Sequence, residues 1–201
     1  AVLMSVLRGE ATEAQLAAFV VALRQKGETV DELSGLVRAM RFACIPINCS
    51  PETIDLVGAG GSQMGRKAAL NVSTIASFVA AGAGAKVCKH GNRKASSTSG
   101  SFDLLEELSI AAELTPEQVS RCVEEVGVGF AYARSFHPAM RHASQVRMEL
   151  GIPTVFNLLG PLSHPASLTR QVIGVPIEAT GKRMAEVLKV TGTELAIVVT
   201  G

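Results

Sequence analysis

The sequence predicts an α/β protein with a small all-helical N-terminal domain, residues 1–46, followed by a larger domain, residues 47–201, with a mainly parallel sheet. Three observations support this prediction. Helix-capping motifs and helical periodicity fill the N-terminal part, and a connector with Pro, Asn and Ser follows at residues 45–53. Beyond the connector, short apolar runs alternate with helical segments, which is typical of a parallel sheet covered by helices.

The N-terminal segment is expected to form helices over residues 1 to 44. Thr12 with Gln15, and Thr29 with Glu32, match the capping box, in which side chains satisfy N–H groups of the first helical turn. Apolar residues recur at helical spacing after the first of these boxes and predict a single apolar stripe. The stripe consists of Leu16, Phe19, Val20 and Leu23.

The larger domain is predicted to alternate between strands and helices. The runs predicted as strands are residues 54–57, 85–91, 153–156, 171–175 and 195–199. Residues 73–85 are almost wholly apolar, which predicts a helix buried on all sides. Thr115 as a cap with Pro116 at the first helical position predicts a helix over 116–126. A further helix is expected around 181–190.

Composition excludes several classes of protein. The 201 residues are 47% hydrophobic with a net charge of +1, which excludes intrinsic disorder and gives no global attraction to nucleic acid or membrane. No apolar run reaches membrane-spanning length, and 4% aromatic residues argue against a base-stacking surface. The spacing of the four cysteines, Cys44, Cys49, Cys88 and Cys122, argues against a zinc site. A reducing, cytoplasmic location is therefore expected.

The local charge pattern favours an anionic ligand. No acidic residue lies between Asp55 and Asp103, although His90 and six cations do. The cations are Arg66, Lys67, Lys86, Lys89, Arg93 and Lys94. Positive charge concentrated in one stretch attracts anions. A solvated basic face is the alternative interpretation.

A glycine-rich loop, residues 58–62, follows the first predicted strand and precedes a helix. Glycines at such a junction let backbone N–H groups approach a phosphate. The loop fails the dinucleotide fingerprint because Gln63 stands where the third glycine belongs, and it fails the P-loop pattern because Arg66 and Lys67 replace Lys-Ser/Thr. A plain turn is equally compatible with this loop taken alone.

Two further polar segments follow in the same region. Residues 71–74 open a helix, so their hydroxyls fit either N-capping or contact with phosphate and a metal-bound pyrophosphate. Residues 89–93 follow the second predicted strand, and a serine-rich turn, residues 96–101, comes next. Because the carboxyl ends of parallel strands meet at one edge of the sheet, these loops predict one ligand site.

Six segments resemble those of the anthranilate phosphoribosyltransferases, within the superfamily that also holds the pyrimidine nucleoside phosphorylases. They are residues 57–61 (VGAGG), 71–74 (NVST), 89–93 (KHGNR), 96–108, 136–151 and 156–166. The likeness covers nearly all of the chain, and the last two segments separate this family from the phosphorylases. It implies transfer of the phosphoribosyl group of phosphoribosyl pyrophosphate (PRPP) to the amine of anthranilate in tryptophan biosynthesis, with Mg²⁺ as cofactor and pyrophosphate as product.

The resemblance also implies the site residues. Those for PRPP are Gly58, Gly61, Ser62, Asn71, Val72, Ser73, Thr74, Lys89, His90, Gly91, Asn92, Arg93, Ser96, Ser97 and Ser101. Ser73 would also contact Mg²⁺. Those for anthranilate are Gly58, Asn92, His137 and Arg147, with the Arg147 guanidinium on the substrate carboxylate. A homodimer through the helical domain is implied as well, and residues 137–150 are expected to pack on that domain.

The chain departs from the family pattern in several places. Ala59 and Ser62 stand where the family usually has Thr and Asp, and His164 replaces an Asn before Pro165. The family's acidic pair for a second Mg²⁺ would lie beyond Gly201, so the chain is expected to be a fragment. The altered glycine loop leaves an alternative open, a non-catalytic or repurposed paralogue that binds nucleic acid or another anionic ligand.

Overall fold

The computed structural model describes residues 1–59, 70–93 and 100–200. Three helices form the N-terminal part, α1 (Val2–Leu7), α2 (Glu13–Lys26) and α3 (Val30–Ala43). Both predicted capping boxes are confirmed, with Thr12 at the start of α2 and Thr29 at the start of α3. Leu16, Val20 and Leu23 of the predicted stripe are buried, while Phe19 is partly buried against the same core.

The described residues form one five-stranded sheet in which all neighbouring strands pair in parallel. Its strands are β1 (Ile54–Gly58), β2 (Val87–Gly91), β3 (Val128–Tyr132), β4 (Arg170–Val175) and β5 (Leu195–Thr200). The spatial order is β3-β2-β1-β4-β5, so the chain leaves β3 and returns to the other side of β1. The predicted parallel sheet is therefore confirmed, with a switch in strand order between β1 and β4.

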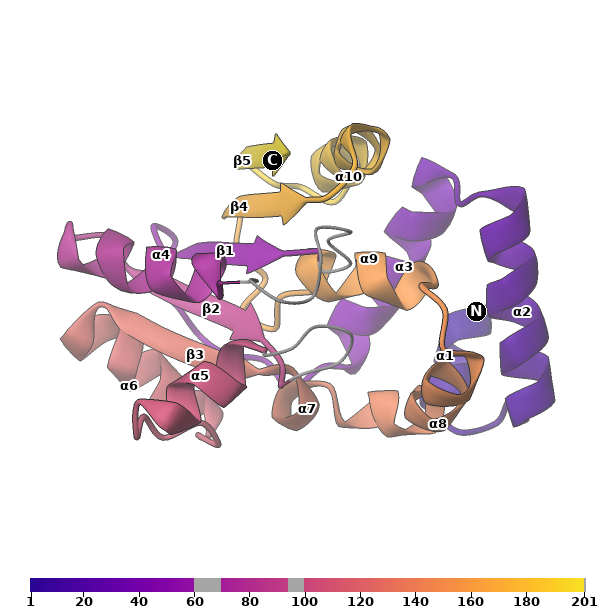
Figure 1. The fold of residues 1–201 in the computed structure, drawn as a ribbon, viewed down its shortest axis with the longest axis horizontal. Coiled ribbons are helices and arrows are strands. Elements are labelled where there is room, and N and C mark those ends of the chain that lie inside the picture. Colours follow the sequence, from indigo (N-terminus) through magenta and orange to yellow (C-terminus); the bar gives the residue numbers. More distant parts are fainter. Residues whose placement is uncertain (60–69, 94–99, 201) are drawn as a thin grey trace.

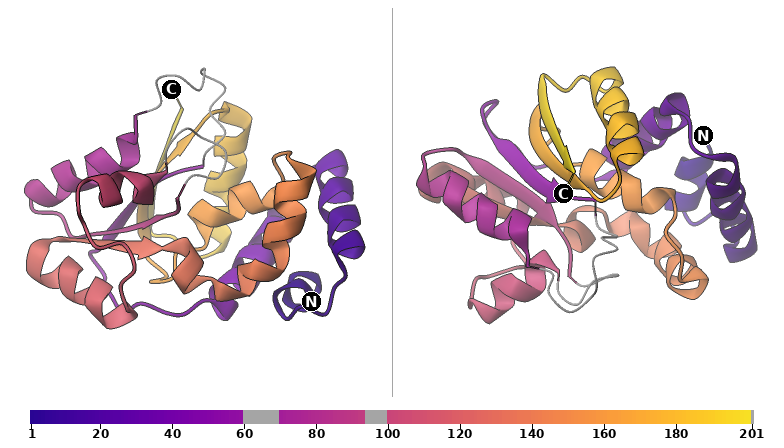
Figure 2. Two further views of the ribbon diagram at one scale, coloured as in Figure 1. Left: turned by 60° about the horizontal axis from the view of Figure 1, so that its bottom comes forward. Right: turned by 45° about the horizontal axis from the view of Figure 1, so that its top comes forward.

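Helices occupy the connections between the strands (Figure 1). They are α4 (Val72–Gly82), α5 (Ser101–Glu107), α6 (Pro116–Val126), α7 (Ala133–Phe136), the 3-10 turn η1 (Pro138–Met140), α8 (Arg141–Leu150), α9 (Val155–Leu162) and α10 (Glu178–Val190). Phe130 and Tyr132 of β3 pack with residues of α4 and α5, whereas Cys88 and Ala131 pack with α6. Figure 2 shows α10 beside β4 and β5.

Two strand predictions were wrong or incomplete. Residues 153–156, predicted as a strand, lead into helix α9, where the Asn157 side chain accepts a hydrogen bond from the Thr154 backbone N–H at 3.0 Å. A short apolar run does not distinguish a strand from a buried helix start. Strand β3 was not predicted. Position 129 in this strand requires glycine, because a Cβ there would lie 2.7 Å from the Val119 carbonyl oxygen of α6.

The prediction that residues 73–85 form a helix buried on all sides was also wrong. Helix α4 buries Thr74 and Ser77, whereas Val72, Ile75 and Val79 are exposed. The helix lies on one face of the sheet, and small side chains allow that close approach. Its exposed face is the apolar one, which reverses the usual amphipathic pattern.

The N-terminal helices share a hydrophobic core with the sheet domain. Helix α8 packs against α1 and α2, and α3 packs against α9 and α10. The Arg41 guanidinium of α3 donates hydrogen bonds to the Leu162 carbonyl at 3.0 and 3.2 Å. No helix of the described segments combines the length and apolarity that crossing a membrane requires.

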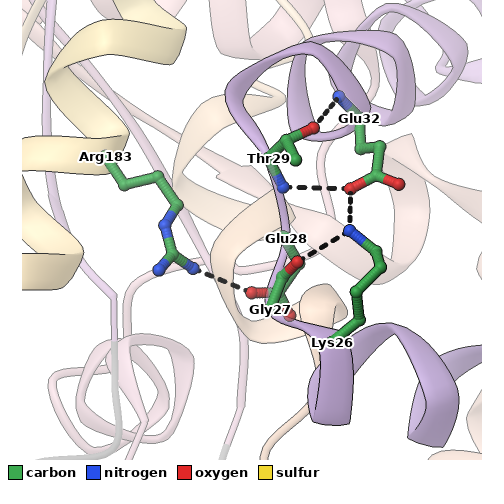
Figure 3. A network of polar contacts seen from close by, with 6 residues as sticks. All are labelled: Lys26, Gly27, Glu28, Thr29, Glu32 and Arg183. Atoms are coloured by element: carbon green, nitrogen blue, oxygen red, sulfur yellow. Dashed lines mark hydrogen bonds and ion pairs between the residues drawn. The ribbon is translucent and has the colours of Figure 1, made fainter.

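A polar network at the α2–α3 turn adds a second link between the two parts (Figure 3). Thr29 and Glu32 exchange the capping-box hydrogen bonds, and Lys26 Nζ lies 2.8 Å from the Glu32 carboxylate. Lys26 is the main cause of a Glu32 pKa lowered to about 2. The neighbouring Glu28 accepts a hydrogen bond from Arg183 of α10 at 2.9 Å. The turn is therefore attached to the sheet domain through one ion pair.

Candidate active site

Several of the predicted site residues lie at or just after the carboxyl ends of β1 and β2, beside the switch in strand order, whereas Arg147 lies on α8. Figure 1 shows β1 and β4 pointing toward α9 and the N-terminal helices. Gly58, the last residue of β1, pairs with Gly174 of β4, and the Ala59 N–H donates to the Gly174 carbonyl at 2.8 Å. Ligands bind at such switch points in open parallel sheets.

The glycine loop begins at this point. Gly58 is exposed, and a Cβ there would meet no atom of the described residues within 4 Å. Ala59, which stands in the place of the family's Thr, is buried. Gly61 and Ser62 lie outside the described residues, as do Ser96 and Ser97 of the serine-rich turn.

The start of α4 presents one hydroxyl toward solvent. Ser73 is half-buried, whereas Thr74 is fully buried and its Oγ1 has no hydrogen-bond partner in the described structure. Asn71 is the N-cap residue, and Val72 is exposed. The described residues contain no group of three or more His, Cys, Asp or Glu that could hold a metal ion. Ser73 thus offers one hydroxyl oxygen, and a hard cation bound beside it would have to take its other ligands from elsewhere.

Lys89, in the middle of β2, has a buried side chain, including its amino group. Only 1% of the residue is exposed, and its Nζ donates a hydrogen bond to the Leu56 carbonyl of β1 at 2.7 Å. Burial lowers the pKa of Lys89 to about 8, against an opposing effect of the Asp55 carboxylate. Asp55 is fully buried as well, and burial raises its pKa to about 7. Asp55 and Lys89 are therefore buried ionisable groups on the neighbouring strands β1 and β2, and the charge of each acts on the pKa of the other.

His90, the next residue, is held on three sides. Its backbone N–H donates to Asp55 Oδ1 at 3.1 Å, and its ring Nδ1 lies 3.2 Å from the Gly160 carbonyl of α9. Its ring centroid is 5.2 Å from that of His137 and 5.5 Å from that of His164. We call His90, His137 and His164 the histidine cluster.

The hydrogen bonds assign the proton positions in the histidine cluster. His164 Nδ1 accepts from the Ala166 N–H at 3.0 Å, so its Nε2 carries the proton and donates to the Cys88 carbonyl at 2.8 Å. His90 Nδ1 must likewise donate to the Gly160 carbonyl. The Nε2 atoms of His90 and His137 are buried with no hydrogen-bond partner within the described segments.

All three imidazoles are neutral at pH 7. Burial is the main cause in each case, and it lowers the pKa of His137 to about 4 and that of His164 to about 3. The pKa of His90 falls well below its usual value. Neutral rings with a protonated Nδ1 leave Nε2 as a hydrogen-bond acceptor. The Nε2 of His90 is therefore a buried acceptor without a partner among the described residues, and the Nε2 of His137 is buried without a described partner as well.

Arg147 lies on α8 with its guanidinium 5.3 Å from the ring centroid of Phe156 on α9. Burial lowers the pKa of Arg147, and no carboxylate in the described part of the chain lies within ion-pair distance of it. Gly160, which bonds His90, follows Phe156 by roughly one helical turn, about 6 Å. Helix α9 thus connects the Arg147 side chain with the histidine cluster.

Asn92 and Arg93 leave β2 toward α5. The Asn92 side chain is exposed and accepts a hydrogen bond from the Arg93 backbone N–H at 2.9 Å. Arg93 is paired with Glu106 and lies 3.5 Å from the Glu113 carboxylate, with its guanidinium over the Tyr132 ring. Among the predicted PRPP residues, Arg93 is therefore already engaged by carboxylates in this structure.

The start of α5 lies directly against the end of β2. A Cβ at Gly91 would come within 3.0 Å of the Ser101 side chain, so glycine is needed for this approach. The Phe102 N–H donates to the Asn92 carbonyl at 3.3 Å. Gly91, Asn92 and Ser101 are therefore brought together, as the motif spacing predicted.

The basic stretch predicted from the sequence is neutralised by acids from other segments. Lys86 pairs with Glu52 at 3.1 Å and also with Glu124 of α6. The buried Asp55 carboxylate acts on the charge of Lys89, and Arg93 is paired as described. Arg66, Lys67 and Lys94 lie outside the described residues. The described cations thus form no free basic face, and the nucleic-acid alternative gains no support from them.

Two residues of the site were not recognised as functional from the sequence. Asp55 served only as a boundary of the acid-free stretch, although a carboxylate inside an apolar strand was an available signal. His164 was noted as a replacement, but its contacts with Cys88 and His90 join segments far apart in the sequence. No local pattern could have revealed that pairing.

Comparison with known proteins identifies the family of this chain. Residues 50–201 match the family model described as glycosyl transferase family, a/b domain, and residues 1–44 match that of its helical bundle domain. An anthranilate phosphoribosyltransferase from Nitrobacter hamburgensis is 49% identical over 197 residues, 98% of this chain and 58% of that protein. The predicted resemblance is confirmed.

Solved structures give the same result. The crystal structure of anthranilate phosphoribosyltransferase from Thermus thermophilus matches with a TM-score of 0.89 and 45% identity, over 96% of this chain and 58% of that one. The Saccharomyces cerevisiae enzyme in complex with PRPP and Mg matches with a TM-score of 0.82 and 30% identity, over 96% and 57%. The chain thus spans less than two thirds of the length of these relatives.

Proposed function

The chain belongs to the glycosyl transferase family that joins a helical bundle domain to an a/b domain, and we propose that it binds PRPP and anthranilate and transfers the phosphoribosyl group to the anthranilate amine. The relatives named for this reaction, and the yeast complex with PRPP and Mg, support the choice of substrates. The product would be N-(5-phosphoribosyl)anthranilate, formed in tryptophan biosynthesis.

The observation that carries the proposal is the arrangement around α9. Anthranilate bears a carboxylate and an amine on neighbouring ring carbons. Arg147 offers a desolvated guanidinium, which binds a carboxylate through paired hydrogen bonds. The histidine cluster, one helical turn away along α9, offers the Nε2 atoms of His90 and His137 as acceptors for the amine protons.

The proposed chemistry needs no strong base. The amine nitrogen forms a bond to ribose C1 while the bond from C1 to the pyrophosphate oxygen breaks, through an oxocarbenium-like transition state. The nitrogen becomes positively charged and strongly acidic, so a weakly basic neutral imidazole, or water, can take its proton. Catalysis then comes mainly from positioning the substrates and from stabilising the charge of the departing pyrophosphate.

The PRPP subsite is proposed at the edge formed by β1, β2 and α4. Gly58, the segment 71–74 and the segment 89–93 would contact PRPP, together with Ser101 and the undescribed Gly61, Ser62, Ser96 and Ser97. Lys89 would offset part of the pyrophosphate charge. Mg²⁺ would be held by the Ser73 hydroxyl and phosphate oxygens, as this ion commonly binds. When bound, it supplies charge neutralisation to the leaving group.

A homodimer through the N-terminal helices is proposed from the surface of α1 and α2. A groove of about 300 Å³ lies between them, lined mainly by apolar side chains that include Val2, Val6 and Phe19. Val2 is 56% exposed. An exposed apolar groove is a common feature of an interface between protein subunits. A cytoplasmic location is proposed because the four cysteines are free thiols.

The decisive test follows the fluorescence of anthranilate in the presence of PRPP and Mg²⁺. We expect a decay that requires both. Arg147→Ala should raise the KM for anthranilate by about tenfold or more while changing that for PRPP by less than about threefold. Arg141→Ala, an exposed arginine on the same helix, serves as the matched control and should change neither. Equal losses for both substrates would contradict the role of Arg147.

A further inference from the structure

We propose that Asp55 is a positioning residue, whose buried carboxylate keeps the Lys89 ammonium charged and fixes the His90 backbone at the end of β2. Asp55 lies near the start of β1, away from the loops that carry the proposed substrate contacts. The inference rests on the proposed function only in that Lys89 and His90 belong to that site. Its core statement concerns two protein groups and can be tested without substrate.

The contacts of the two carboxylate oxygens support this role. Asp55 Oδ1 accepts the His90 N–H at 3.1 Å, while Oδ2 is buried without a hydrogen-bond partner among the described residues. An unbonded buried carboxylate oxygen costs folding free energy unless a nearby cation compensates it. Lys89 is the cation that acts on Asp55, and Asp55 is 0% exposed.

Lys89 depends on Asp55 in turn. Its Nζ is bonded to the neutral Leu56 carbonyl, so no other described carboxylate balances the charge of its ammonium. Burial alone favours the neutral amine, and only the Asp55 carboxylate opposes it. Without that carboxylate, Lys89 would lose its proton at a lower pH and could no longer offset the charge of a polyphosphate.

The other titratable groups near Asp55 and Lys89 carry no charge above pH 7. His90 lies beside Lys89 on β2, and His164 faces it from the segment after α9, but both imidazoles are neutral above pH 7. The Cys88 thiol has its pKa raised well above the usual value, mainly by its contact with the Cys49 thiol, so it is neutral as well. The charge state of Lys89 is therefore governed by Asp55.

The variant Asp55→Asn tests the charge of the Asp55 side chain separately from its shape. The asparagine side chain has the same size, and its amide oxygen can still accept the His90 N–H, but it carries no charge. Glu52→Gln is the matched control, because it makes the same chemical change at an exposed position near the start of β1. Lys89→Met identifies the Lys89 signal by its disappearance.

The experiment follows the ¹³Cε resonances of labelled lysines by NMR while pH is raised. In the unaltered protein we expect Lys89 to titrate near 8, and in Glu52→Gln to do the same. In Asp55→Asn it should titrate lower by about one unit or more. An unchanged Lys89 titration in folded Asp55→Asn would overturn the inference.

A second measurement links this pair to the site. Binding of inorganic pyrophosphate with Mg²⁺ is measured between pH 6 and 9. We expect Asp55→Asn to bind like the unaltered protein at pH 6 and about tenfold more weakly at pH 8. A loss of equal size at both pH values would overturn the charge role of Asp55. If neither protein binds pyrophosphate while the Lys89 titration still shifts, the PRPP site is refuted and the Asp55–Lys89 coupling stands.

Discussion

The carboxyl end of β2 and the outer face of β5 differ in the side chains that they bury and expose. At β2 the chain buries Asp55, Lys89 and the histidine cluster, whereas β5 exposes Leu195, Ile197 and Val199 to solvent. Burying charge costs folding free energy, so a protein keeps such groups inside for their chemistry. Exposed hydrocarbon on a strand carries no chemistry but favours association. The difference supports the chemistry proposed at β2, and it leads us to expect that the exposed β5 face can take part in contacts with another chain.

The largest effect on stability is expected from His164→Ala in the histidine cluster. The substitution leaves the Cys88 carbonyl and the Ala166 N–H without their hydrogen bonds and creates a cavity. We expect a loss of about 3 kcal/mol in the free energy of unfolding, measured by urea denaturation. Ser163→Ala is the control, because that buried hydroxyl has no described hydrogen-bond partner. A similar loss in both variants would show that His164 acts through packing alone.

The next effect is a loss of stability in acid. The three clustered histidines have pKa values below their unfolded value, so their contribution is present above pH 6.5 and is lost as pH falls toward 3. Asp55 acts in the opposite direction, because its raised pKa of about 7 lets the folded state take up a proton first. Three imidazoles outweigh one carboxyl, so the free energy of unfolding should decrease between pH 6.5 and 4.

His137→Phe tests this assignment. It removes one of the buried imidazoles, so its curve of unfolding free energy against pH should be flatter than that of the unaltered protein below pH 6. Asp55→Asn should give a steeper curve, because the opposing carboxyl is gone. Val190 is exposed and carries no titratable group, so Val190→Phe is the control variant and should leave the slope unchanged. Parallel curves in all four proteins would refute the pKa assignment of the cluster.

Local patterns in the sequence were enough to predict most elements of the fold. The capping boxes at Thr12, Thr29 and Thr115 are short-range signals, and each marks the start of a helix. Residues 153–156 were misassigned because an apolar run this short shows neither helical nor strand periodicity. The hydrogen bond from the Thr154 N–H to the Asn157 side chain marks a helix start instead. Strand β3 was missed because Gly129 is required by α6, a contact that only the tertiary structure supplies.

Site residues that lie in contiguous motifs could be predicted from the sequence. Contacts between residues far apart in the sequence could not. The segments at 71–74 and 89–93 lie at one sheet edge, as expected for loops after parallel strands. The acid-free stretch suggested free positive charge, yet Lys86 and Arg93 are paired with carboxylates from distant segments. Charge counted along a chain does not measure charge in space, and for the same reason Asp55 was overlooked.

A smaller effect is expected at the link between α2–α3 and α10. Glu28→Gln replaces the ion pair with Arg183 by a neutral contact. Arg183 is partly exposed, so we expect a loss of about 0.5–1 kcal/mol in the free energy of unfolding, which should shrink in high salt. Glu178→Gln, which removes an exposed ion pair with Lys182 within α10, is the control and should cost less. This measurement gives the loss of unfolding free energy for an ordinary polar contact, with which the loss in His164→Ala can be compared.

The smallest effect on stability is expected at β5, where Ile197→Lys places a charge on the exposed apolar face. Ile197 is 52% exposed, so the free energy of unfolding should change by less than about 0.5 kcal/mol. Association beyond the dimer proposed through the N-terminal helices should nevertheless decrease, because a charge on an edge strand opposes pairing with another chain. Light scattering across a concentration series measures this, with Val190→Lys on α10 as a control of similar exposure. Equal association in both variants would show that the β5 face is not the contact surface, and the comparison with β2 would then rest on buried polarity alone.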